Sequence, residues 1–177
     1  MTDKGAYTYD YPRPMVTVDA VVFSVRDGRL EVLMIQRKHD PHAGSWALPG
    51  GFVDMDESLD TAVARELAEE TNLTGVELEQ FRTFGDPNRD PRGRSISVAF
   101  LGVVDWRGHA PCAADDAAEA AWLPLDGLPE LAFDHGLIVR YAVRRLRELT
   151  EHNPQPSFLR AIPARDLRSA LKAFPGT

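Results

Sequence analysis

The chain has 177 residues, 44% of them hydrophobic and 27% charged, which is the composition of one globular domain and excludes a disordered or fibrous protein. Its formal net charge of -7 disfavours a dedicated nucleic-acid binder, because an acidic protein repels the phosphate backbone. A single cysteine, Cys112, excludes an internal disulfide and a zinc site built from paired cysteines.

The N-terminal residues 1–14 are polar and tyrosine-rich, and they end with Pro12 and Pro14. Proline fixes the backbone and removes a hydrogen-bond donor, so this segment predicts an extended arm rather than a helix. Neither the arm nor any later segment has the apolar length of a signal peptide or a membrane-spanning helix. We therefore expect a cytoplasmic protein without a membrane partner.

Two stretches rich in β-branched residues, 15–25 and 30–38, follow the arm. Asp27 and Gly28 between them are a strong signal for a β-hairpin turn. Residues 85–94 contain two prolines, two glycines and three arginines, and this composition predicts a loop. Further strands are expected at 76–84, 95–106 and 120–128, the last of which runs into a turn.

Two helices are predicted, at 58–71 and 135–150. In the second, apolar residues recur at helical spacing and arginines lie opposite them. The tail, residues 153–177, has room for one short helix at 164–174. Strands interrupted by one central and one C-terminal helix indicate an α/β (α+β) fold in which a mixed β-sheet is sandwiched between helices.

The first helix carries three glutamates, Glu66, Glu69 and Glu70, whose spacing places them on one face. Like charges at this spacing destabilise a helix, and Arg65 offsets only part of the repulsion. We therefore expect a cation over this face. Mg²⁺ is the natural candidate, because it binds a few carboxylate oxygens and leaves other positions for water and substrate phosphates. The alternative is a solvated acidic surface, which is the commoner meaning of such a triplet by itself.

The longer segment 51–73 resembles the Nudix box, a pattern of fixed residues at fixed spacing. Asn72 stands where the family has its last glycine. Because helices often end in a left-handed residue, and asparagine is the next best occupant after glycine, we expect the helix to run from an N-cap at Ser58 to a left-handed Asn72. The positions of this chain that match the Nudix box are Gly51, Glu57, Arg65, Glu66, Leu67, Glu69, Glu70 and Leu73.

The resemblance implies a Nudix fold and a metal-dependent hydrolase that uses Mg²⁺, for which Mn²⁺ can substitute. In the family the final two glutamates of the box, here Glu69 and Glu70, bind metal. The glutamate after the arginine, here Glu66, is a metal ligand or the general base. The box arginine and the first glutamate, here Arg65 and Glu57, orient these groups.

A backbone carbonyl beside the box glycine, here that of Gly50, often completes the metal shell in the family. Many members also place an acidic residue in a loop before the last strand. The candidates are Asp115, Asp116 and Glu119, and we take Asp116 as a candidate catalytic base. The alternative is a solvated loop.

Roughly residues 9–150 resemble the ADP-ribose pyrophosphatase branch, through YPRPMVTVD, HAGSWALPGGFV, FGDPNRDPRGRSISVAF and AFDHGLIVRYAVRRLR. The branch implies a homodimer that converts ADP-ribose, a small-molecule nucleotide, to AMP and ribose 5-phosphate. It includes Nudix-related transcriptional regulators of NAD metabolism, whose winged-helix domain has no counterpart in the tail. The expected organisation is an arm (1–14), a Nudix domain (15–152) and a tail (153–177).

Two other functions stay open. One is a Nudix hydrolase for a dinucleotide, a nucleotide sugar or an oxidised nucleoside triphosphate. The other is a non-catalytic regulator that senses ADP-ribose, which the intact glutamates and the acidic charge disfavour.

Candidate substrate-binding residues are those that bind phosphate oxygens or stack on a base. The alternatives are solvated arginines and a tryptophan that only packs. A zinc site at His39 and His42 is rejected, because the Asp-Pro between them disfavours a helix and no third ligand is evident. The candidates are Arg37, Trp46, Arg89, Arg92 and Arg94.

Overall fold

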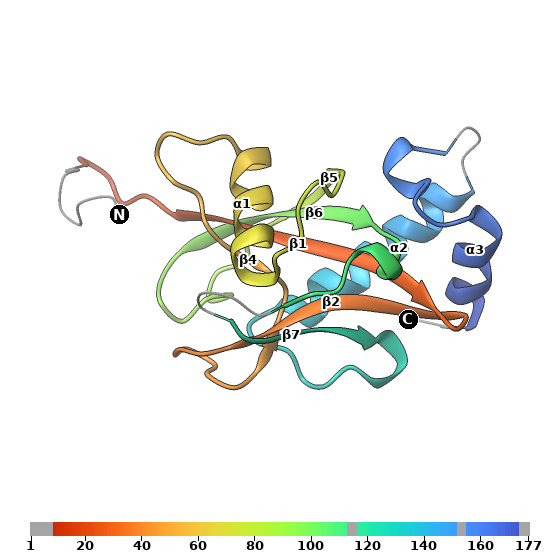
Figure 1. Cartoon of the computed structure of the whole chain (residues 1–177). Coiled ribbons are helices and arrows are strands. Elements are labelled where there is room, and N and C mark those ends of the chain that lie inside the picture. The colour runs from red at the N-terminus through yellow and green to blue at the C-terminus, as the bar shows by residue number, and fades with distance from the viewer. Residues whose placement is uncertain (1–8, 113–116, 152–154, 174–177) are drawn as a thin grey trace.

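The computed structural model describes residues 9–112, 117–151 and 155–173 (Figure 1). The strands are β1 (Met15–Arg26), β2 (Arg29–Arg37), β3 (Trp46–Ala47), β4 (Gly50–Phe52), β5 (Leu78–Phe84), β6 (Ser95–Val103) and β7 (Ala117–Pro124). The α-helices are α1 (Leu59–Thr71), α2 (His135–Thr150) and α3 (Ala164–Ala173). Short 3-10 turns occupy Trp106–Gly108, Leu125–Gly127 and Ser157–Leu159.

The strands form one mixed sheet in the order β3-β2-β1-β6-β5, with β4 also paired to β1 and β7 to β2. Strands β1 and β6 run parallel, and the other pairs are antiparallel. Strand β1 changes partner along its length. Its first part pairs with β4, where Thr17 lies opposite Phe52, and its last part pairs with β2. The glycine-rich strand β4 is thereby held against the start of β1.

The predicted hairpin is confirmed. Asp27 and Gly28 have φ angles of 51° and 76°, and both values are positive as a two-residue type I′ turn requires. Arg26 and Arg29 face each other across the turn.

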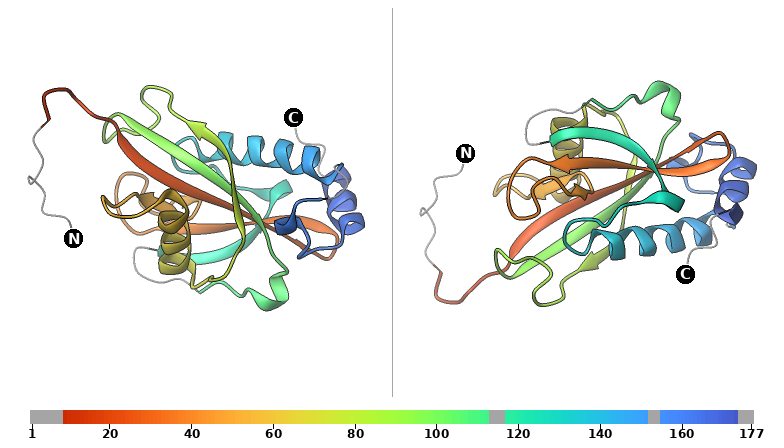
Figure 2. Two further views of the ribbon diagram at one scale, coloured as in Figure 1. Left: turned by 90° about the horizontal axis from the view of Figure 1, so that it is seen from above. Right: turned by 90° about the horizontal axis from the view of Figure 1, so that it is seen from below.

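Each face of the sheet has its own hydrophobic core, because successive side chains of a strand point to opposite sides. Val18, Ala20 and Val22 of β1 pack in one cluster with α1. Val21 and Phe23 pack in the other cluster, which includes α2 and α3. Figure 2 shows the sheet between α1 and α2 from both directions. The expected sheet between helices is therefore confirmed.

Both predicted ends of the central helix are confirmed. The hydroxyl of Ser58 accepts a hydrogen bond from the backbone N–H of Thr61 at 3.1 Å, and α1 begins with the next residue. Asn72 is left-handed, with φ 59° and ψ 13°, and its N–H donates to the carbonyl of Ala68 at 2.9 Å. Leu73 then turns back into the cluster that contains α1.

Several expected strands have different ends in the structure. The strand expected at 120–128 runs from Ala117 to Pro124, and a 3-10 turn at Leu125–Gly127 follows it. The strand expected at 76–84 starts at Leu78, and the strand expected at 95–106 ends at Val103. Strand β6 ends before Asp105 because Asp105 accepts a hydrogen bond from the N–H of Arg107 and caps a 3-10 turn.

The short helix expected at 164–174 is α3, and it buries Leu167, Ala170 and Leu171 in the same core as α2. Residues 9–14 of the expected arm form no helix or strand, and the rest of the arm lies outside the described residues. Within the described ranges, no helix combines the length and hydropathy needed to cross a membrane.

Candidate active site

Arg65 is the centre of a hydrogen-bond network on α1. Its Nε and Nη2 donate to the two carboxylate oxygens of Glu57 at 3.1 and 2.6 Å. Its Nη1 donates to Glu66 at 2.8 Å and to Glu69 at 3.0 Å. The hydrogen bond from Arg65 holds the pKa of Glu57 below its usual range, and the same contact raises the pKa of Arg65. Arg65 therefore fixes the orientation of three glutamates as a permanently charged fork.

Glu66 lies directly against Gly51 of β4. A β carbon placed on Gly51 would stand 2.4 Å from Oε1 of Glu66 and 2.6 Å from its Cδ. Burial raises the pKa of Glu66, although the hydrogen bond from Arg65 lowers it in part. Glycine at position 51 thus leaves the space that the Glu66 carboxylate occupies.

Glu70 is the most buried carboxylate of this face, with 8% of its surface exposed. Its Oε2 accepts a hydrogen bond from the N–H of Gly50 at 2.9 Å. Burial raises the pKa of Glu70 to about 8, and the Gly50 hydrogen bond offsets only part of that effect. Gly50 has a φ of 156°, and a β carbon there would lie 2.1 Å from the carbonyl oxygen of Val18. Only glycine fits so close to β1.

These carboxylates suit a hard cation. Within the described ranges, no three His, Cys, Asp or Glu side chains form a ready-made metal-binding group, because Arg65 engages Glu66 and Glu69. Burial nevertheless raises the pKa of both Glu66 and Glu70, and a charge buried without sufficient compensation is stabilised by a nearby cation. The donors are oxygen atoms, which Mg²⁺ prefers. The residues present therefore fit a hard divalent cation.

A small pocket of about 40 Å³ opens beside Gly50, the residue that donates to Glu70. It is much smaller than the few hundred Å³ of an ordinary ligand site, so a nucleotide would extend beyond it. Three of the five candidate substrate residues line it, and Trp46 and Arg94 do not. The lining residues are Thr17, Asp19, Arg37, Leu48, Gly50, Gly51, Arg89, Asp90, Arg92, Phe133 and His135.

Two of the three arginines of this pocket, Arg89 and Arg92, are held by acidic partners. Arg89 donates through Nε and Nη2 to both oxygens of Asp134 at 2.9 and 2.7 Å, and its side chain is only 6% exposed. The solvated alternative is therefore wrong for Arg89. Arg92 forms a similar fork on the buried Asp90 and is 37% exposed. Burial opposes ionisation of Asp90, but the hydrogen bonds from Arg92 outweigh it and lower the pKa of Asp90.

Arg37 approaches the pocket from the end of β2, and its Nε donates to the carbonyl of Pro41 at 2.9 Å. Arg94 instead donates from Nη1 to the carbonyl of Ser95 at 2.9 Å. Trp46 lies on β3, and its side chain packs on the core. Its backbone carbonyl accepts a hydrogen bond from the N–H of Ala132. Its position matches the packing alternative.

Asp115 and Asp116 lie outside the described residues. Glu119 is exposed on β7, opposite Gln36 of β2. The general base expected in this loop therefore stays a prediction.

Sequence reasoning missed a buried polar network behind the pocket. Nδ1 of His135 accepts a hydrogen bond from the N–H of Leu48 at 2.8 Å, and its Nε2 lies 3.6 Å from the carboxylate of Asp19. The hydroxyl of Ser97 donates to the same carboxylate. Burial lowers the pKa of His135. Its Nδ1 carries no proton, because it accepts the hydrogen bond from Leu48. A charged residue inside the otherwise apolar strand β1 was the available signal for Asp19.

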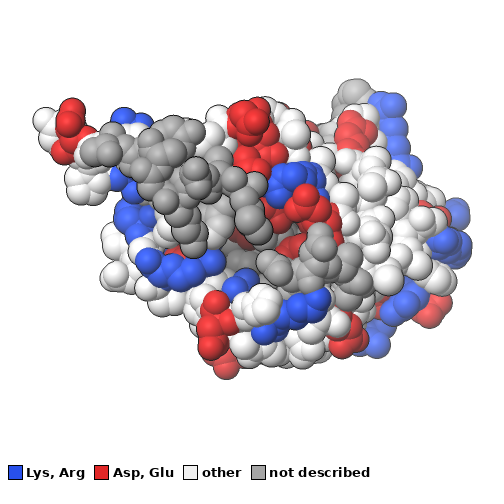
Figure 3. Space-filling model, turned by 60° about the vertical axis from the view of Figure 1, so that its left-hand side comes forward, with Lys and Arg blue, Asp and Glu red and all other residues white. Residues whose placement is uncertain are grey.

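Acidic and basic side chains lie next to each other on the face drawn in Figure 3, and they do not form separate acidic and basic patches there. This arrangement agrees with the pairing of the pocket arginines with carboxylates.

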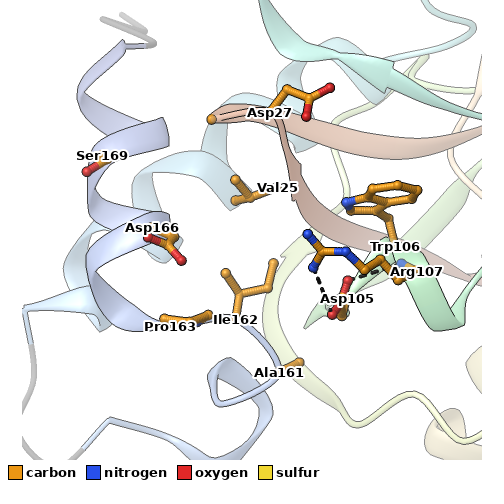
Figure 4. A pocket seen from close by; sticks show the side chains of 11 residues that line it. Val25, Asp27, Asp105, Trp106, Arg107, Ala161, Ile162, Pro163, Asp166 and Ser169 are labelled. Atoms are coloured by element: carbon orange, nitrogen blue, oxygen red, sulfur yellow. Dashed lines mark hydrogen bonds and ion pairs between the residues drawn. The ribbon is translucent and has the colours of Figure 1, made fainter.

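A separate pocket of about 330 Å³ lies at the other end of the molecule, between the β1–β2 turn and α3 (Figures 1 and 4). Its wall contains Val25, Trp106 and Ile162, with Asp27 and Asp166 at the rim. No residue of the box segment 51–73 lines this pocket, whereas Gly51 of the box and Gly50, which holds Glu70, line the small one. We therefore assign the chemistry to the face of α1.

Comparison with known proteins agrees with this assignment. The NUDIX domain family model matches residues 14–146. An ADP-ribose pyrophosphatase of Methanocaldococcus jannaschii is 41% identical over 76% of this chain and 76% of its own length. The ADPR responsive transcriptional repressor NtrR of Acinetobacter baylyi is 36% identical over 83% of this chain. The chain spans only 60% of the length of that repressor.

Two solved structures are also similar. The NUDIX domain of Shewanella oneidensis NrtR, in complex with ADP ribose, aligns with a TM-score of 0.72 and 36% identity, over 82% of this chain and 99% of that one. A MutT/nudix family protein from Enterococcus faecalis aligns with a TM-score of 0.82 and 32% identity, over 96% of this chain and 78% of that one. Because the family model covers residues 14–146 and a relative is 41% identical over 76% of the chain, the chain belongs to the Nudix family.

Proposed function

We propose that this Nudix pyrophosphohydrolase hydrolyses ADP-ribose to AMP and ribose 5-phosphate with Mg²⁺ as its metal. The observation that carries the proposal is that Gly50, whose N–H holds the buried Glu70 of α1, lines a pocket together with three arginines. Support for the substrate comes from the 41% identical relative named ADP-ribose pyrophosphatase and from the similar domain complexed with ADP ribose.

In this proposal Glu66, Glu69, Glu70 and the carbonyl of Gly50 would hold Mg²⁺. When bound there, the metal would supply positive charge that neutralises pyrophosphate oxygens and favours ionisation of the attacking water. Arg65 fixes the carboxylates, with Glu57 as its anchor. The base that takes the proton from the attacking water is Glu66 or Asp116.

The arginines bind the diphosphate. Arg37, Arg89 and Arg92 line the pocket next to Gly50, and guanidinium groups bind phosphate oxygens in a planar geometry. The whole chain carries a formal charge of -7, and Asp134 and Asp90 pair with two of these arginines. An anionic substrate therefore depends on the guanidinium donors together with the metal.

A second candidate is a regulator that binds ADP-ribose without cleaving it. The observation in its favour is the 36% identity to a protein named as an ADPR responsive repressor. The intact metal-binding face favours the enzyme. A cytoplasmic location and a homodimer stay predictions from the family resemblance.

The test is a substrate panel with product analysis. ADP-ribose, a dinucleotide, a nucleotide sugar and an oxidised deoxynucleoside triphosphate are each incubated with the protein and Mg²⁺. We expect the highest kcat/KM for ADP-ribose, with AMP and ribose 5-phosphate as products. Preference for another substrate would overturn the substrate assignment, and tight binding of ADP-ribose without turnover would favour the regulator.

A further inference from the structure

Phe133 has an unusual backbone conformation at the edge of the pocket. It precedes α2 by two residues and has a φ of 52°. A side chain with a β carbon is strained in this left-handed region, so glycine or asparagine is the ordinary occupant. Such strain persists where the surrounding contacts enforce it, and it concentrates at functional sites.

The contacts of the Phe133 ring join segments that are far apart in the sequence. The guanidinium carbon of Arg37, at the end of β2, lies 5.0 Å from the ring centroid. That of Arg92, from the loop between β5 and β6, lies 5.4 Å from it. The ring of His42 meets it edge-on at 4.6 Å. Phe133 therefore contacts two of the three pocket arginines at once.

A guanidinium that stacks on an aromatic ring uses its flat face, and its N–H edge stays available for oxyanions. Arg92 illustrates this arrangement. Phe52 lies 4.9 Å from its guanidinium on a second side, and Asp90 engages its Nε and Nη2. Its Nη1 makes no hydrogen bond to any residue that the structure describes. The guanidinium is held in one place while one donor group remains for a ligand.

We propose that Phe133 is a positioning residue for the diphosphate, whose ring holds the guanidiniums of Arg37 and Arg92 at the pocket so that both bind the same substrate group. This inference rests on the proposed function, and it adds that Phe133 sets the affinity of the pocket for the diphosphate. It assigns Phe133 no chemical step, so the residue acts on substrate binding and not on turnover.

The primary variant is Phe133→Leu, which keeps an apolar side chain of similar size and removes the ring. We expect KM for ADP-ribose to rise about 10-fold, equivalent to about 1.4 kcal/mol, with kcat changed less than about twofold. The dissociation constant of ADP-ribose, measured in EDTA to prevent turnover, should rise by the same factor. Phe133→Tyr, which restores the ring, should return both values to those of the wild type.

A matched control removes an arginine–aromatic stack elsewhere. The guanidinium of Arg82 lies 3.9 Å from the ring centroid of Tyr141, on the side of the molecule that carries α2, and neither residue lines the pocket. Tyr141→Leu should leave KM unchanged.

A double-mutant cycle tests whether Phe133 acts through its partner. In an Arg92→Ala background, Phe133→Leu should raise KM by less than it does in the wild type. An equal effect in both backgrounds, or an unchanged KM in Phe133→Leu with its melting temperature retained, would overturn the inference. If the leucine variant does not fold, Phe133→Met is measured in its place under the same criteria.

The proposed function and the role of Phe133 are refuted by different results. Wild-type protein that neither cleaves nor binds ADP-ribose refutes the function, and the inference with it. Wild-type protein that binds and cleaves ADP-ribose, with an unchanged leucine variant, refutes the inference alone.

Discussion

Gly51→Ala should abolish most activity without unfolding the protein. The new β carbon would lie 2.4 Å from Oε1 of Glu66, whereas ordinary contacts begin at 3.4 Å, so the carboxylate must move by about 1 Å. A displacement of that size at a catalytic group costs roughly 100-fold in rate. Gly51 has no left-handed φ, and only the end of a side chain has to move. Removing a glycine also lowers the entropy of the unfolded chain, so the unfolding free energy should change by no more than about 1 kcal/mol.

The assay measures kcat on ADP-ribose and urea unfolding of the same preparations. Gly108→Ala is the matched control, because no atom lies within 4 Å of its β carbon, and it should leave kcat unchanged. Gly50→Ala is the opposite case. Its β carbon would stand 2.1 Å from the backbone of Val18 at a φ of 156°, so stability and activity should fall together. Full activity of Gly51→Ala, or a loss of stability as large as that of Gly50→Ala, would refute the reasoning.

Two further predictions concern stability. Asn72→Gly should change the unfolding free energy by at most about 1 kcal/mol, whereas Asn72→Val should cost more, because a β-branched residue is strained at a φ of 59°. Equal melting temperatures for the two variants would contradict this explanation. In metal-free protein, Glu70 has a folded-state pKa of about 8 against an ordinary 4.5, so its contribution to stability is complete below about pH 4.5 and is lost as the pH rises towards 8. The unfolding free energy of the wild type relative to that of Glu70→Gln, both measured in EDTA, should therefore fall as the pH rises over that range. A difference that stays constant with pH would count against the burial of this carboxylate.

Local sequence signals predicted the parts of the fold that depend on local chemistry. The turn at Asp27 and Gly28 and both ends of α1 follow from residue types that suit a specific backbone conformation. The sandwich of the sheet between helices follows from the periodicity of the apolar residues.

The pocket was less predictable because its contacts are long-range. The ion pair of Arg89 with Asp134 spans 45 positions, and no spacing rule connects them. Phe133 gave no signal, since phenylalanine is an uncommon residue at positive φ. The role of Trp46 was also undecided by sequence, because a tryptophan beside a glycine-rich turn suits either packing or stacking.

The central claim is that the carboxylate face of α1 and a divalent metal hydrolyse ADP-ribose. The most direct measurement is the rate of AMP formation from ADP-ribose as a function of Mg²⁺ concentration, for wild type and Glu70→Gln in parallel. We expect a rate that saturates with Mg²⁺ and disappears in EDTA. In Glu70→Gln the rate should fall by roughly 100-fold or more at retained melting temperature, because one charged ligand is lost at nearly constant volume. Full activity in excess EDTA, or an unchanged rate in Glu70→Gln, would contradict the central claim.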